Sequence, residues 1–184
     1  MKNRGFTIIE LVVVLAVMAI AMAIALPRFR LTPSHKVRSA ANQLVRDLEL
    51  ARTRALGTKR KVRIQFDATG GTYTAYLDDD GNGTISESAA ERSAYGSLAS
   101  RTLEPDVLFG RGSTTGLPGD PGSGAVTFSG AEVDFATNGV TVPFGTSGNI
   151  YLVSRDDAKV VAAVSVTGAG SFKVWRYAGG STWQ

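Results

Sequence analysis

An apolar run near the N-terminus constrains this chain more than any other feature of its sequence. From Phe6 to Leu26 only Thr7 and Glu10 are polar. At about 1.5 Å of rise per residue the run makes a helix roughly 32 Å long, which is enough to cross the hydrocarbon core of a bilayer. Two basic residues precede the run, so we expect the N-terminus to stay in the cytoplasm and the rest of the chain to be exported.

Glu10 places a carboxylate inside this run, and a charge in lipid is costly unless it faces a cation or is neutralised. Cleavage of the chain after Gly5 would create a new α-amine on Phe6. The amine of one subunit can then pair with Glu10 of a neighbour, and their attraction is stronger in a low-dielectric environment than at a wet surface. We therefore predict that Glu10 sets the axial register between assembled subunits.

An ordinary secretory signal is the alternative, because the small residues between Ala19 and Ala25 imitate a signal-peptidase site. Two features oppose it. The charged region before the apolar run is only five residues long, and Glu10 lies inside the segment that would enter lipid. We therefore expect the apolar segment to remain in the mature chain.

The stretch Gly5-Phe6-Thr7-Ile8-Ile9-Glu10-Leu11 resembles the class III signal of type IV prepilins and type II secretion pseudopilins. The resemblance implies cleavage after Gly5 by a prepilin peptidase, N-methylation of Phe6, and Glu10 as the acid at the fifth position of the mature chain. It also implies a single-pass protein of the bacterial inner membrane with its C-terminal head in the periplasm. Such a subunit later enters a periplasmic pseudopilus or an extracellular pilus. The implied partners are other pilins or pseudopilins, an inner-membrane assembly platform, and membrane lipid before assembly.

A second helix is predicted after the apolar run. Pro27 lacks an amide hydrogen and falls where many pilins kink the stem helix, so we expect a kink there. Thr32-Pro33-Ser34 is typical of a helix start, and Gly57 is typical of a helix end. Between them apolar residues recur at helical spacing on one face. They are Val37, Ala40, Ala41, Leu44, Val45, Leu48, Ala51 and Ala55.

The charge of the chain is unevenly distributed. From Arg28 to Arg63 eleven Lys and Arg residues accompany two acids, whereas from Ile64 to Gln184 seven accompany thirteen. Four arginines lie opposite the apolar face of the second helix: Arg38, Arg46, Arg52 and Arg54. Their simplest explanation is a solvated helix face. The alternative is contact with acidic heads of neighbouring subunits or with anionic lipid headgroups.

After Gly57 the sequence alternates with the period of β-strands. The predicted strands are Val62–Phe66, Tyr73–Leu77, Val107–Phe109, Ala125–Phe128, Glu132–Phe135, Asn149–Ser154, Lys159–Val166 and Phe172–Tyr177. Turns are predicted at Gly70-Gly71, Asn138-Gly139 and Asp156-Asp157, and a long loop at Arg111–Gly124 with five glycines and two prolines.

These elements predict an α+β fold in which a long N-terminal helix, half transmembrane and half amphipathic, packs on an antiparallel β-sheet head. The predicted segments are a leader at 1–5, a transmembrane and filament-core helix at 6–26, an amphipathic stem helix at 27–57, and a β-rich head at 58–184. This layout resembles the GspH/FimT branch of minor pseudopilins and minor pilins. The resemblance implies a structural subunit of a type II secretion pseudopilus or type IV pilus, acting in filament initiation or at the tip.

A tip pilin that captures DNA for uptake is the alternative function. FimT-type pilins that bind DNA tend to carry a Gly-Arg-x-Arg element near the C-terminus, and the corresponding stretch here, Gly168–Lys173, lacks the arginines. A local basic patch would still allow DNA binding. Its candidate members are Arg155, Lys159, Lys173 and Arg176.

An acidic loop after the second predicted strand is a candidate calcium site. Asp78, Asp80 and Asn82 occupy alternate positions before Gly83, like the first half of an EF-hand loop. The twelfth position is Ala89, so Glu87 or Glu91 would have to supply the missing carboxylate. The alternative is a polar turn without metal. Heat of binding on titration with Ca²⁺ distinguishes the two.

The sequence offers little for catalysis. His35 is the single histidine and the chain has no cysteine, which excludes a thiol nucleophile and a paired-histidine zinc site. It also lacks a phosphate-binding Gly-Lys motif. We therefore predict that the protein is not an enzyme.

Overall fold

The computed structural model describes residues 7–25, 32–97, 99–120, 122–179 and 182–184. The chain divides into two compact units, residues 1–32 and residues 33–184. Helix α1 (Ile8–Ala25) belongs to the first unit, and α2 (Pro33–Thr58) belongs to the second together with the strands. The predicted stem helix, 27–57, thus lies in the head unit from Pro33 onward. Pro27 lies outside the described residues, so its kink stays a prediction.

Helix α1 begins with a local cap at Thr7. The Thr7 side-chain oxygen accepts a hydrogen bond from the Glu10 amide at 3.3 Å, and its carbonyl accepts one from the Leu11 amide at 3.2 Å. Large apolar side chains are exposed all around the helix. Among the described residues, none of the helices combines the length and the apolar character needed to cross a membrane.

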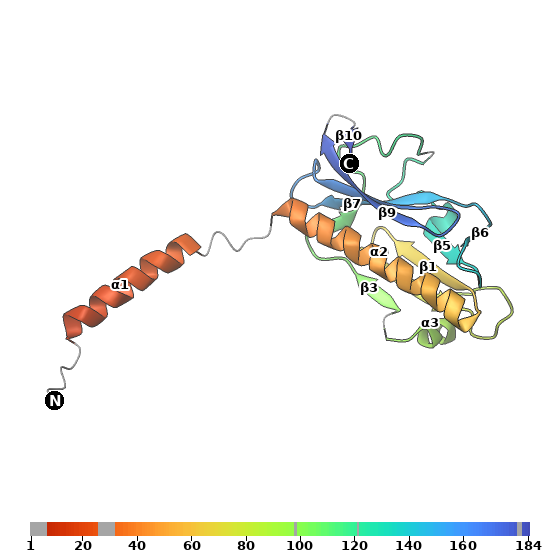
Figure 1. Cartoon of the computed structure of the whole chain (residues 1–184), viewed down its shortest axis with the longest axis horizontal. Coiled ribbons are helices and arrows are strands. Elements are labelled where there is room, and N and C mark those ends of the chain that lie inside the picture. Colours follow the sequence, from red (N-terminus) through yellow and green to blue (C-terminus); the bar gives the residue numbers. More distant parts are fainter. Residues whose placement is uncertain (1–6, 26–31, 98, 121, 180–181) are drawn as a thin grey trace. The chain divides into compact units, whose positions relative to one another are not determined.

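Helix α2 starts at Pro33 and ends one residue after Gly57, which confirms the predicted start and stop signals. The predicted apolar face is confirmed as well, since Val45 is half-buried and the other seven residues are buried. Helix α2 packs along both sheets of the head, against β1, β7, β8 and β9 (Figure 1). This amphipathic face joins the helix to the head.

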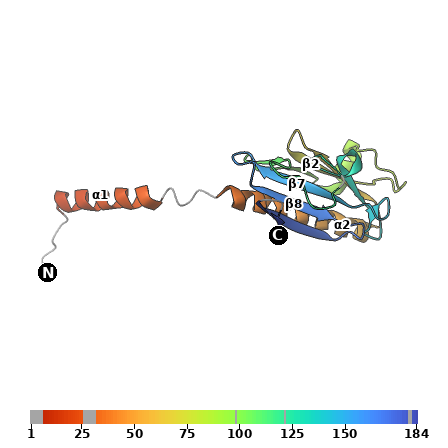
Figure 2. The same cartoon turned by 90° about the horizontal axis from the view of Figure 1, so that it is seen from above.

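The described strands form two antiparallel sheets that lie in layers with α2 (Figure 2). The first sheet has the order β3-β2-β1-β5-β6 and the second the order β10-β9-β8-β7-β4. The first comprises β1 (Val62–Asp67), β2 (Thr72–Leu77), β3 (Ser100–Thr102), β5 (Glu132–Phe135) and β6 (Thr141–Val142). The second comprises β4 (Val107–Phe109), β7 (Gly148–Ser154), β8 (Val161–Val166), β9 (Phe172–Gly179) and β10 (Thr182–Trp183).

The main core lies where α2 meets the inner faces of the two sheets. Leu44 and Leu48 of α2 pack with Ile64 of β1, Phe135 of β5 and Ile150 of β7, and all five are buried. Each fully buried side chain of this size contributes about 1.5–3 kcal/mol. This burial holds α2 and both sheets in one unit.

A second, smaller core covers the outer face of the second sheet. Its buried members are Tyr151, Val153, Val161 and Ala163, with Leu117, Trp175, Tyr177 and Trp183 packed against them. Leu117 comes from the predicted glycine-rich loop, residues 111–124, which we call the strap. The Trp183 indole donates a hydrogen bond to the Gly116 carbonyl at 3.0 Å and ties the strap to β10. Both faces of this sheet are therefore covered.

A charged network fixes the strap. The Arg111 guanidinium lies 2.6 Å from the Asp120 carboxylate, whose side chain is 1% exposed. The Tyr151 hydroxyl donates to the same carboxylate, and its oxygen accepts from the Leu117 amide at 2.8 Å. Burial, followed by this bond to Asp120, raises the pKa of Tyr151 to about 12. The neutral tyrosine thus anchors the strap to β7.

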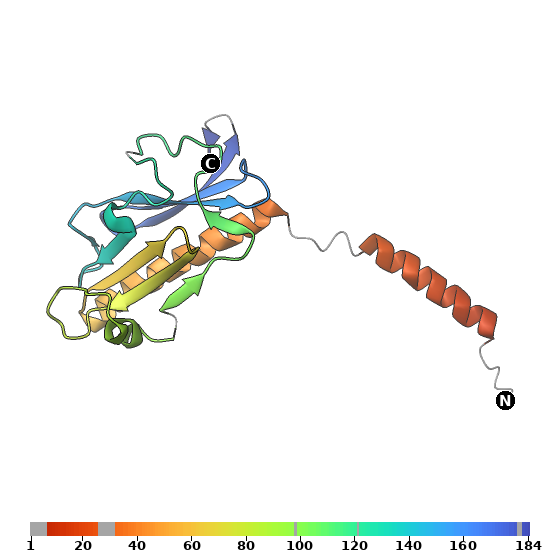
Figure 3. The ribbon, with the colours of Figure 1, turned by 180° about the vertical axis from the view of Figure 1, so that it is seen from behind.

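Helix α3 (Ala89–Tyr95) was not predicted. It lies beside β2, as seen from behind in Figure 3. The Ser88 side chain accepts from the Glu91 amide, and the Glu91 carboxylate accepts from the Ser88 amide. This is a capping box, and the sequence Ser-x-x-Glu was its available signal.

The prediction of a strand at Ala125–Phe128 is wrong. Val126 forms a single bridge with Ile150. The Asn149 amide donates to the side-chain oxygen of Thr127 at 2.8 Å, where a continuous ladder would use a backbone carbonyl. The hydroxyl therefore interrupts the pairing after one bridge.

Candidate functional site

Glu10 is the predicted assembly residue, and it lies in the first turn of α1 with its side chain exposed. Its neighbours Ile9 and Leu11 are apolar and are 72% and 56% exposed. A carboxylate near a helix N-terminus is favoured by the helix dipole. The geometry thus presents one acid on an otherwise apolar surface. Gly5 and Phe6, the predicted processing residues, lie outside the described residues.

The predicted calcium loop is organised by its own hydrogen bonds. The Asp78 carboxylate is buried and accepts from the amides of Gly81 and Gly83 at 2.9 and 2.8 Å. Asp80 accepts from the Asn82 amide at 3.1 Å, and this bond is the main cause of the lowered pKa of Asp80. These carboxylates thus accept hydrogen bonds from backbone amides, as they do in turns that bind no metal.

The two glutamates considered as further calcium ligands bind elsewhere. Glu87 pairs with Arg63 of β1 at 3.0 Å, while Arg63 also pairs with Asp134 at 2.7 Å. Glu91 caps α3; burial alone would raise its pKa, but hydrogen bonds from Ser88 and Ser86 lower it overall. Within the described ranges, no group of three acidic or histidine side chains is arranged to hold a metal ion. Calcium binding by this loop stays a prediction.

The four arginines of α2 do not form one solvated face. Arg52 donates to the Gly139 carbonyl at 2.9 Å, and the Arg54 guanidinium lies 4.8 Å from the centre of the Tyr95 ring. Arg46 donates to the Gln43 side chain at 2.7 Å. Arg38 is exposed and makes no hydrogen bond or ion pair to the described part of the chain. Arg52 and Arg54, two of the four, therefore contact other elements of the head unit.

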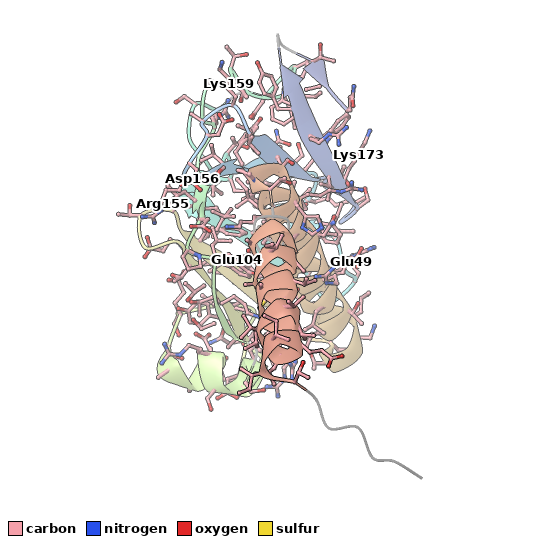
Figure 4. All side chains as sticks on the ribbon, turned by 90° about the vertical axis from the view of Figure 1, so that its left-hand side faces the viewer. Glu49, Glu104, Arg155, Asp156, Lys159 and Lys173 are labelled. Carbon is pink, nitrogen blue, oxygen red and sulfur yellow. The ribbon has the colours of Figure 1, made fainter. Side chains whose placement is uncertain are left out.

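The candidate DNA-binding patch is divided by the sheet. Val174 of β9 packs in the main core on the α2 side, whereas Trp175 packs in the smaller core on the outer side. Because successive side chains of a strand alternate between faces, Arg176 lies on the α2 side and Lys173 on the outer side. Figure 4 also shows Lys159 and Lys173 well apart. The four cations thus do not form one continuous surface.

Comparisons with known proteins agree with this architecture. Residues 1–26 match the model of the prokaryotic N-terminal methylation motif, and residues 40–170 match the model of type II transport protein GspH. No curated protein sequence matches the chain.

Two solved structures are similar to this fold. The type IV minor pilin FimU of Pseudomonas aeruginosa is 18% identical with a TM-score of 0.51, over 75% of this chain and 87% of FimU. The minor pseudopilin EpsH of Vibrio cholerae is 11% identical with a TM-score of 0.50, over 78% of this chain and 99% of EpsH. At these identities the similarity establishes the pilin-like α+β fold.

Proposed function

Because the chain belongs to the GspH family of type II transport proteins, which are structural and not enzymatic, we propose that this minor pseudopilin or pilin starts a filament or sits at its tip. The methylation motif implies processing by a prepilin peptidase and anchoring in the inner membrane. The remaining proposed partners are the neighbouring filament subunits and the inner-membrane assembly platform.

One observation carries the proposal: an exposed carboxylate on a helix that is otherwise apolar. Ile8, Ile9 and Leu11 surround Glu10 with exposed apolar side chains. Such a helix is stable only in lipid or against other apolar helices, and its acid needs a cation in either place. A neighbouring subunit with a free N-terminal amine supplies that cation.

A subunit that starts filaments and a subunit that is built in along the whole shaft should differ in the effect of deleting their gene. We expect cells lacking this chain to make fewer filaments of unchanged length, because a starter subunit would supply the nucleus from which each filament grows. Gold labelling of the head should mark filament ends. Counting and measuring filaments by electron microscopy checks both expectations, and label spread evenly along the shaft would contradict the proposal.

Processing predicts the first residue of the mature chain. We expect mass spectrometry of the purified protein to find N-methylated Phe6 at the N-terminus. Replacing Gly5 with Glu should leave the full-length chain uncleaved, because a charged side chain replaces the smallest residue beside the cleavage site. A mature chain that begins beyond Ala25 would show that the apolar helix is removed as a secretory signal.

A further inference from the structure

A pocket of about 380 Å³ lies in the head unit between the N-terminal part of α2 and the end of the second sheet. Its floor is apolar and includes Val37 of α2, Ala162 of β8 and Val174 of β9. The rest of its lining is mostly polar, with Ser34 and Asn42 from α2. The helix and the sheet thus diverge here and leave an open amphipathic space.

Three cations line this pocket from three separate elements. They are Arg38 of α2, Lys159 of the turn before β8, and Arg176 of β9. The side chains of Arg38 and Lys159 make no hydrogen bond or ion pair to the described residues, and Arg176 donates at 3.0 Å to the neutral side chain of Gln184.

No Asp or Glu side chain of the described chain lines the pocket. The charged side chains of the lining therefore carry a net of three positive charges. Three cations and an apolar floor in one pocket suit an anion that is attached to an apolar body.

The pocket lies close in the sequence to the apolar helix α1, which suggests a membrane lipid as the ligand. Ser34 is in the first turn of α2, and only seven residues, 26–32, separate α2 from the apolar helix α1. Seven residues span at most about 25 Å when fully extended. A membrane that holds α1 is therefore within reach of the pocket.

We propose that this pocket binds the phosphate of an anionic phospholipid while the subunit is still anchored in the membrane. Arg38, Lys159 and Arg176 contact the phosphate, and the apolar floor covers the adjoining glycerol and upper acyl chain. The site holds the head against the membrane before the subunit enters a filament. This inference rests on the membrane-anchored stage of the proposed function.

Hydrogen–deuterium exchange of the full chain in lipid nanodiscs tests the proposal. We expect residues 34–42 and 174–177 to exchange about fivefold more slowly in discs containing phosphatidylglycerol than in discs of phosphatidylcholine alone. Each cation near an anionic surface contributes roughly that factor to binding. The triple variant Arg38→Gln, Lys159→Gln, Arg176→Gln should lose the difference.

A matched variant controls for net charge. Lys59, Arg92 and Arg155 are exposed and lie outside the pocket, so their replacement by Gln removes the same charge and should keep the lipid effect. Circular dichroism confirms that both triple variants are folded. If both triple variants lost the lipid-dependent protection equally, the lipid effect would come from general attraction between the head and the anionic membrane surface, and the proposal of a specific pocket would be overturned.

Three further outcomes would also overturn the assignment. Equal exchange in both kinds of disc would show that no anionic lipid binds. Protection by inorganic phosphate in phosphatidylcholine discs, as strong as that by phosphatidylglycerol, would indicate a site for a free anion. Protection by a DNA oligonucleotide in place of lipid would indicate a nucleic-acid site. The lipid effect should persist in a Glu10→Val variant, so failure of assembly and failure of lipid binding are distinguishable.

Discussion

Replacing Glu10 with Val is expected to stop this subunit from entering filaments while leaving it in the membrane. The exposed carboxylate in the first turn of α1 is costly in lipid, so its removal favours insertion. In a filament the same change would remove one partner of the proposed ion pair between Glu10 and the N-terminal amine of a neighbouring subunit. Loss of such a partner costs about 3–5 kcal/mol, so we expect incorporation to fall on the order of a hundredfold or more.

Immunoblotting of sheared filaments and of membranes measures both quantities. Glu10→Gln keeps the shape of the side chain but removes its charge, so it should fail like Glu10→Val if the ion pair is what matters. Glu49→Val removes an exposed acid from α2 and should assemble normally. Wild-type incorporation of the Glu10→Val subunit would contradict the ion-pair mechanism.

Replacing Asp120 with Ala is expected to cause a large loss of head stability. The change leaves the Arg111 guanidinium, which is 11% exposed, without its anion and removes the acceptor of the Tyr151 hydroxyl. Breaking a buried pair in this way costs about 3–5 kcal/mol. For a unit of this size that corresponds to a fall in Tm of about 10 °C.

Thermal unfolding of the full chain in detergent measures this effect. Asp156→Ala is the matched control, because Asp156 is exposed on the turn between β7 and β8, where Figure 4 shows it. Its Tm should stay within about 2 °C of wild type, as for most surface substitutions. Similar Tm values for the two variants would show that the strap adds little to the stability of the head.

The sequence predicted the elements that have a strong period. The apolar face of α2 and the hairpin of β1 and β2 follow directly from the spacing of buried residues and from the Gly70-Gly71 turn. Edge strands such as β6 and β10 were missed because two residues are too short to show alternation. Their pairing depends on neighbours that are distant in the chain.

The site was predicted unevenly for a related reason. Glu10 could be recognised from the sequence because it is a charged residue inside an apolar run. The binding of Arg52 to the Gly139 carbonyl, in contrast, joins residues 87 positions apart and has no local pattern. The pocket lined by Arg38, Lys159 and Arg176 likewise has no local sequence pattern, because three separate elements contribute one cation each. Such groupings follow from the packing of α2 on the sheets.

The outermost strands of both sheets are short: β3 and β4 have three residues each, and β6 and β10 have two. Each offers few unpaired backbone groups to a strand from another molecule. Short edge strands therefore disfavour cross-β growth between heads. The proposed assembly through α1 could then proceed without competition from strand pairing between heads.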